Sequence, residues 1–109
     1  MIKPITYDDW RKLDLRVGEV IKSEAHPDAE KLLVLRLKIG KEERTVVAGI
    51  KAYYDPKKLV GKKVVVLTNL QPRELRGIKS EGMILAAVDG DNVVLLQPEK
   101  DIPSGAKIQ

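Results

Sequence analysis

Few side chains in this sequence could take part in bond-making chemistry, and their spacing does not assemble a catalytic group. His26 is the single histidine, and there is no cysteine thiol for it to activate. Ser80 does not lie in a Gly-x-Ser-x-Gly elbow, and the adjacent Glu42 and Glu43 would point to opposite sides of an extended segment. We therefore expect no enzyme, no metal site and no cofactor, and we interpret His26 as a residue that fixes its loop.

The basic residues gather in the middle of the sequence, a distribution suited to phosphate groups. The segment from Lys31 to Ser80 holds 13 Lys and Arg against 4 acidic residues, whereas the rest of the chain holds 7 against 12. Each phosphate that a cation neutralises releases condensed counterions, and this release drives association with nucleic acids. On charge alone, a polyanion-binding face and a solvated lysine-rich surface both remain open.

The segment from Asn69 to Gly82 is long and polar for a connection between two buried strands, and long ordered loops are usually functional. It supplies Arg73, Arg76 and Lys79 for phosphates. It also supplies Asn69 and Ser80 as hydrogen-bonding side chains. A solvated loop in which these two cap turns is the alternative for either residue taken singly.

The elements that must position these residues are mainly short strands. Thr6 is a candidate N-cap with Asp9 three residues later, and Gly18 interrupts an alternating strand and predicts a bulge there. In chain order, the patterns predict a helix over residues 7–12, strands over 13–21, 33–39 and 44–50, a loop over 23–30, a helix between 55 and 61, a strand over 63–68, and a hairpin of 83–88 with 93–97.

One short helix between the third and fourth strands matches the order of elements in an OB barrel. We therefore expect an all-β fold with little helix: a five-stranded OB barrel with short helices and a C-terminal hairpin extension. The length of 109 residues predicts a single domain over 1–109. An SH3-like barrel is the main structural alternative.

Five motifs resemble those of a known family. They are Asp14-Leu-Arg-Val-Gly18, His26-Pro-Asp-Ala-Glu-Lys-Leu32, Arg44-Thr-Val-Val-Ala-Gly-Ile50, Asn69-Leu70 and Arg76-Gly-Ile-Lys-Ser-Glu-Gly-Met83. In this order they resemble the tRNA-binding domain at the C-terminus of many methionyl-tRNA synthetases and in the endothelial-monocyte-activating polypeptide. The resemblance runs nearly from end to end.

The resemblance implies an OB barrel that docks on the outer corner of folded tRNA through shape and backbone. It places Asn69, Ser80, Glu81 and Met83 on the RNA-binding side, together with Lys31. Charge and position add three further candidates, Arg73, Arg76 and Lys79. The resemblance also implies a role beside methionyl-tRNA synthetase, as its C-terminal domain or as a separate subunit, and assembly as a homodimer.

The homodimer needs an apolar surface, and the sequence offers candidates for it. These are the residues Val93 to Leu96, Trp10 and Ile102, although core packing explains them nearly as well. No signal peptide or membrane-length apolar run is present. We therefore expect a cytoplasmic protein with no membrane partner.

Two other functions remain as alternatives. The chaperone-like CsaA proteins resemble this sequence and are reported to handle unfolded export proteins, and an exposed apolar groove would distinguish them. A general single-strand binder would stack bases on several aromatic rings. Tyr53 and Tyr54 are the only candidates for stacking, and packing beside the helix after Asp55 is the favoured reading for both.

Overall fold

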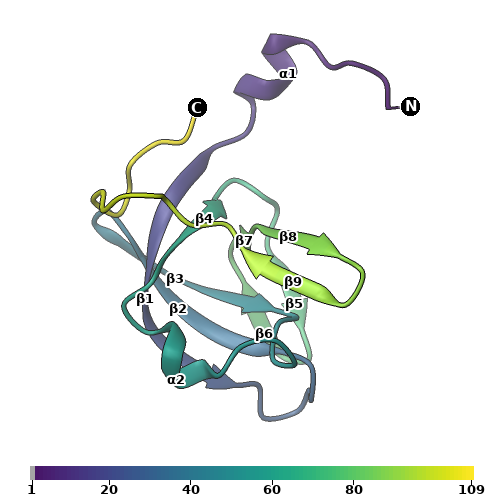
Figure 1. Cartoon of the computed structure of the whole chain (residues 1–109), viewed down its shortest axis with the longest axis vertical. Helices are drawn as coiled ribbons and strands as arrows, with labels where there is room; N and C mark the ends of the chain where they lie inside the picture. Colours follow the sequence, from purple (N-terminus) through teal and green to yellow (C-terminus); the bar gives the residue numbers. More distant parts are fainter. Residues whose placement is uncertain (1) are drawn as a thin grey trace.

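Five strands form one curled antiparallel sheet in the computed structural model, which describes residues 2–109 (Figure 1). The strand order is β3-β2-β1-β4-β7. The bounds are β1 Leu15–Ala25, β2 Leu33–Ile39, β3 Glu42–Ala48, β4 Lys63–Leu67 and β7 Met83–Ile84. This is the mainly β, OB-like half-barrel that the sequence predicts.

The inner face of the sheet forms the core because apolar residues alternate with polar ones along the strands. Leu33, Leu35 and Leu37 of β2 are fully buried against Val64 and Val66 of β4. Burying each such side chain contributes about 1.5–3 kcal/mol. The predicted strand at residues 33–39 is confirmed by this alternation.

Strand β1 is longer than predicted and bends at a different residue. Its register with β2 shifts between Val20 and Lys22, so the bulge does not lie at Gly18. Gly18 has another reason to be glycine: a Cβ there would lie 2.8 Å from Cγ2 of Val66. Pairing with β2 continues to Ala25, so the loop predicted to begin at residue 23 begins at 26.

Both predicted helices are present and short. In α1 (Tyr7–Arg11) the Thr6 hydroxyl accepts a hydrogen bond from the Asp9 amide at 3.1 Å, as the capping pattern predicts. No residue of α1 is buried, and the helix projects away from the sheet (Figure 1). Helix α2 (Pro56–Leu59) is capped by Asp55 and buries Leu59 in the core.

The polar segment predicted as a loop contains a hairpin instead. Strands β5 (Arg73–Leu75) and β6 (Ile78–Ser80) pair in register, and β6 packs against β3. Arg76 and Gly77 form the turn with φ of 52° and 88°, the positive values that a tight two-residue hairpin turn requires. The sequence did not indicate this turn, because its first residue is an arginine and such turns usually have Asn, Asp or Gly there.

The predicted strand at 83–88 divides into two. Met83 and Ile84 pair with β4, whereas β8 (Ala86–Asp89) pairs with β9 (Asn92–Leu95) across a turn at Gly90. The C-terminal segment then returns to β1, where the Ile108 amide donates to the Leu15 carbonyl at 2.9 Å. Over residues 2–109, no helix has the length and apolar character needed to cross a membrane.

Candidate nucleic-acid interface

His26 ties its loop to the β5–β6 hairpin. Its side chain is only 4% exposed, and its Nδ1 accepts a hydrogen bond from the Asp28 amide at 3.0 Å. The proton therefore lies on Nε2, which donates to the Leu75 carbonyl at 3.0 Å. Both ring nitrogens are satisfied, which confirms the loop-fixing interpretation.

This attachment brings two of the candidate cations to one place. Lys31 follows His26 in the loop, and Arg76 follows Leu75 in the hairpin. Both line a cavity of about 490 Å³, together with Asp28, Ala29, Glu30 and Leu32. Two cations separated by 45 positions in the sequence thus share an opening, which the carboxylates of Asp28 and Glu30 also line.

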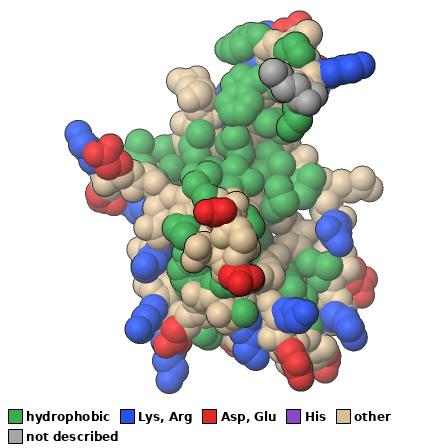
Figure 2. Space-filling model, turned by 45° about the vertical axis from the view of Figure 1, so that its right-hand side comes forward, with side chains coloured by type: hydrophobic (Ala, Val, Ile, Leu, Met, Phe, Trp, Pro, Cys, Tyr) green, Lys and Arg blue, Asp and Glu red, His purple; other side chains and the backbone are tan. Residues whose placement is uncertain are grey.

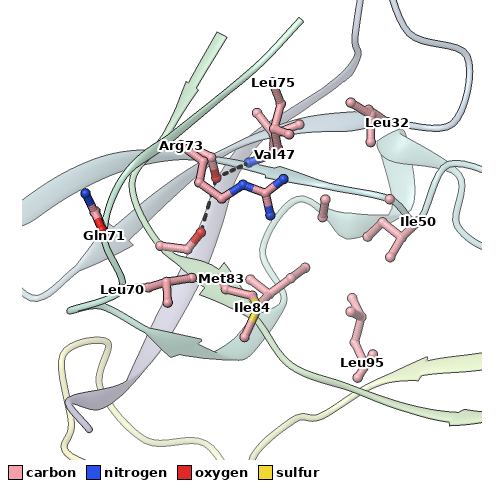
Figure 3. Close-up of a pocket in the computed structure, with 15 residues that line it drawn as sticks. Leu32, Val47, Ile50, Leu70, Gln71, Arg73, Leu75, Met83, Ile84 and Leu95 are labelled. Carbon is pink, nitrogen blue, oxygen red and sulfur yellow. Dashed lines mark hydrogen bonds between the residues drawn. The ribbon is translucent and has the colours of Figure 1, made fainter. Parts of the chain in front are cut away.

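A second cavity is an apolar groove, which Figure 3 shows. Leu32 lines both cavities, so the two adjoin there. Its volume is about 280 Å³, and Arg73 points into it from the hairpin. The other lining residues come from the segment before β2, the end of β3 and the residues after it, the segment before β5, and strands β5 to β9. They include Val47, Ile50, Leu70, Gln71, Ser80, Met83, Ile84 and Leu95. The sequence analysis missed this groove because its walls come from segments far apart in the chain.

Ser80 lies in the wall of this groove and has a structural role. The side chain is only 5% exposed, and its Oγ accepts from the Val47 amide at 2.9 Å and donates to the Gly82 carbonyl at 3.1 Å (Figure 3). The Glu81 amide donates to the Thr45 carbonyl at 2.8 Å beside it. These bonds hold β6 and the following turn against β3.

Asn69 lies outside both cavities and binds the N-terminal segment. Its Oδ1 accepts from the Asp14 amide at 2.9 Å, and its Nδ2 donates to the Lys12 carbonyl at 2.5 Å. The next two residues, Leu70 and Gln71, line the apolar groove. Asn69 therefore connects the base of α1 to the wall of the groove, while an RNA contact for its side chain stays a prediction.

Asp14 is the centre of a polar cluster at this end of the barrel. The Thr68 hydroxyl donates to Asp14 Oδ2, and Arg16 Nε lies 2.9 Å from Oδ1. The hydrogen bond from Thr68 and then the Arg16 guanidinium lower the pKa of Asp14 below its ordinary value of 3.8. No group of three or more His, Asp or Glu side chains suited to a metal ion occurs among residues 2–109.

The candidate cations have no ion-pair partner within residues 2–109, a property that they share with several other lysines. Seven salt bridges occur within residues 2–109, and they engage Arg11, Lys12, Arg16, Lys22, Arg36, Arg44 and Lys63. Lys31, Arg73, Arg76 and Lys79 take part in none of these seven. Their charge therefore remains available on the hairpin side of the molecule.

The remaining candidates are divided between the groove and the outside. Met83 is 42% exposed at the groove, whereas Lys79 and Glu81 do not line it. The structure thus groups Arg73, Ser80 and Met83 at one cavity, and Lys31 and Arg76 at the adjoining one.

Comparisons with known proteins identify the relatives of this chain. Residues 15–107 match the family described as "Putative tRNA binding domain". The methionine–tRNA ligase of Pyrococcus horikoshii is 50% identical over 105 residues, which are 96% of this chain and 14% of that protein. The methionine–tRNA ligase of Deinococcus radiodurans is 53% identical over 106 residues, which are 96% of this chain and 16% of that protein. The chain thus spans a small part of the curated relatives that it matches.

The solved structures that share the fold include the following two. The MetRS related protein from Pyrococcus horikoshii has a TM-score of 0.93 at 34% identity, covering 99% of this chain and 100% of that one. The chaperone CsaA from Bacillus anthracis has a TM-score of 0.89 at 33% identity, covering 98% and 100%. With a family match over most of its length, this chain belongs to the tRNA-binding-domain family.

Proposed function

We propose that this chain binds folded tRNA on its outer corner, without catalysing a reaction, through the side that carries the β5–β6 hairpin. The observation that supports this most is the grouping of basic residues at two adjoining cavities: Lys31 and Arg76 line one and Arg73 lines the other. None of these three forms a salt bridge within residues 2–109. Unpaired cations neutralise phosphates without first breaking an ion pair. The His26 bond to Leu75 fixes two of these cations relative to each other before RNA arrives.

Contacts to shape and backbone suit this surface better than stacking of a single strand. The Tyr54 hydroxyl accepts a hydrogen bond from the Leu95 amide at 2.9 Å, so this ring is part of the core region. Tyr53 is 46% exposed, and the other two aromatic residues, Tyr7 and Trp10, lie on α1. Single-strand binders use several such rings, whereas a folded RNA is recognised largely through phosphates and riboses.

The cellular role that we propose is to raise the tRNA affinity of methionyl-tRNA synthetase. The relatives that match this chain are methionine–tRNA ligases, and the match covers 14% of the Pyrococcus protein. A tRNA-binding unit attached to a catalytic region, in cis or in trans, increases the effective concentration of tRNA at that region. The protein acts in the cytoplasm, and residues 1–109 act as one domain.

A homodimer is the assembly that best accounts for the exposed apolar surface. Trp10 and Leu13 are exposed at α1 and after it, and Leu96 and Ile102 are exposed near the C-terminal segment. Hydrophobic side chains extend from α1 onto the body of the molecule in Figure 2. Val93 and Leu95, which the sequence offered for the interface, pack against the core instead. Surfaces of this kind commonly mark protein contacts.

The test is the binding of a fluorescent folded tRNA, followed by anisotropy at several salt concentrations. Lys31→Gln and Arg76→Gln should each weaken binding and lower the slope of log K against log salt by about 1. Lys100→Gln is the matched control, because it removes an exposed, unpaired lysine from the C-terminal segment. Equal loss with all three variants would contradict a specific RNA-binding side.

A second candidate function is the capture of unfolded polypeptide. The apolar groove is the feature that favours it, and the structural neighbour from Bacillus anthracis is described as a chaperone. An unfolded polypeptide that competes with tRNA, or binds more tightly than tRNA at moderate salt, would favour this function. Arg73 in the groove, with Lys31 and Arg76 at the adjoining cavity, favours tRNA, since an apolar polypeptide gains nothing from these charges.

A further inference from the structure

The apolar groove remains without an occupant in the function proposed above. Its floor is apolar, with Leu70, Met83, Ile84 and Leu95 among its lining residues, yet Arg73 points into it (Figure 3). Met83 and Leu70 remain 42% and 39% exposed, so part of this floor faces water. The apolar groove lies beside an unpaired positive charge. A ligand that fits both features has a flat apolar part and an anionic part.

We propose that the groove takes one unpaired base of the bound RNA, while Arg73 and Lys31 hold the phosphates on either side of it. The proposal rests on the tRNA-binding function above and assigns a specific ligand to this cavity. A nucleotide combines an apolar ring with a charged phosphate, which matches the floor and the rim respectively. The rim is shared, because Leu32 lines both this groove and the cavity that holds Lys31.

The side chains present are suited to the face of a base. A methionine thioether makes favourable contacts with aromatic rings and adapts to their shape. A guanidinium such as that of Arg73 is attracted to the face of an aromatic ring as well as to phosphate. The Gln71 side chain at the groove offers a hydrogen-bond donor and acceptor to the edge of a base.

Charge complementarity distinguishes this occupant from an apolar polypeptide. Arg73, which lines the groove, forms no salt bridge within residues 2–109. An apolar peptide in the groove would leave its charge partly desolvated and unpaired, which is costly. A base brings its own phosphate and so provides the counter-charge.

The first experiment is methyl NMR of the full chain during titration with a folded tRNA. An inserted base should shift the Met83 ε-methyl and Leu95 δ-methyl resonances upfield through its ring current, while the Val88 methyls, which do not line the groove, stay unchanged. A blunt RNA duplex with the same number of phosphates is the matched ligand, since it offers no unpaired base. The duplex should leave the chemical shifts of the groove methyls unchanged.

The second experiment removes part of the floor. Met83→Ala should weaken tRNA binding roughly two- to tenfold while leaving the salt slope unchanged, because no phosphate contact is lost. Val88→Ala is the control, since it shortens an exposed side chain on β8 outside the groove. Thermal unfolding of both variants separates lost binding from lost folding.

The outcomes separate this proposal from the function on which it rests. If the wild-type chain binds tRNA with the expected salt slope, but the groove methyls do not move and Met83→Ala binds normally, only the base-binding proposal fails. If the wild-type chain does not bind tRNA at all, the proposed function fails first. Groove methyls that respond to an unfolded polypeptide and not to tRNA would assign the cavity to polypeptide instead.

Discussion

The imidazole Nε2 of His26 donates to the carbonyl oxygen of Leu75 at 3.0 Å across 49 positions of sequence. Replacing it in His26→Ala removes this bond and leaves the Asp28 amide without its Nδ1 partner. We expect the free energy of unfolding to fall by about 1–3 kcal/mol, the usual effect of orphaning buried polar groups. Urea unfolding measures this change, and tRNA anisotropy should show weaker binding because Lys31 and Arg76 are no longer held together.

Asp28→Ala is the control for the hydrogen bonds of the His26 side chain. It removes the Asp28 carboxylate but keeps the amide that His26 accepts from, so stability should change little. The carboxylate lines the cavity that holds Lys31 and Arg76, and its removal should strengthen tRNA binding if it has any effect. Equal destabilisation by both variants would show that the imidazole bonds are not what fixes the loop.

Ser80 should affect stability more than RNA contact. In Ser80→Ala the buried Val47 amide loses its acceptor, so we expect the free energy of unfolding to fall by about 1–3 kcal/mol. Ser104→Ala should cost less, because the Ser104 hydroxyl accepts from Gly40 at 3.3 Å in a less buried place. Chemical denaturation of the two variants tests this order. Weaker tRNA binding by Ser80→Ala at unchanged stability would instead indicate direct contact.

Asp14 should make folding sensitive to acid. The Thr68 hydroxyl and the Arg16 guanidinium lower the pKa of Asp14 in the folded state below 3.8. A depressed folded pKa stabilises the fold above the unfolded value and loses this contribution as pH falls through the folded value. The difference in unfolding free energy between wild type and Asp14→Asn should therefore shrink as pH is lowered below about 3.8. A difference that is the same at pH 7 and in acid would refute the assignment.

Gly18 should tolerate no side chain, for reasons of space. A Cβ at this position lies 2.8 Å from Val66 Cγ2 in the core, so Gly18→Ala should cost about 1–3 kcal/mol through overpacking. At Gly49 the nearest atom to an added Cβ is Leu32 Cδ2, at 3.8 Å. Gly49→Ala should therefore be tolerated, and thermal unfolding compares the two.

The Asn69 side chain should affect the attachment of helix α1 more than it affects tRNA binding. Asn69→Ala removes the bonds to the Asp14 amide and the Lys12 carbonyl. We expect looser attachment of α1, seen as faster rotation of Trp10 in fluorescence anisotropy decay, and a weaker dimer by sedimentation. At protein concentrations that keep both proteins dimeric, tRNA affinity should be unchanged. Weaker binding there, with the same salt slope, would assign the uncharged Asn69 side chain to RNA contact after all.

Local patterns in the sequence predicted the parts of the fold that local physics determines. Alternating leucines predicted β2, and the Thr6 and Asp55 side chains predicted the starts of both helices. The bulge after Val20 was misplaced because Gly18 looked like a backbone signal, whereas it is required by contact with Val66 across the sheet.

The site was predicted in its chemistry and not in its geometry. Charge and motif identified Lys31, Arg73 and Arg76. No local pattern in the sequence could show that Lys31 and Arg76 share a cavity. That depends on the bond between His26 and Leu75. The hairpin that carries Arg73 was missed because its strands are only three residues long and half of their residues are exposed, so they show no clear alternation.

The two ends of the chain lie on the same side of the molecule. In Figure 1 the N-terminal segment and the C-terminus lie at the top, whereas β5, β6 and α2 lie below them. The C-terminal segment is held there by hydrogen bonds to the beginning of β1. A fluorophore, an affinity tag or a fused polypeptide attached at either end would therefore extend away from the hairpin. A chip that immobilises the protein by either end would present the same face to the solution.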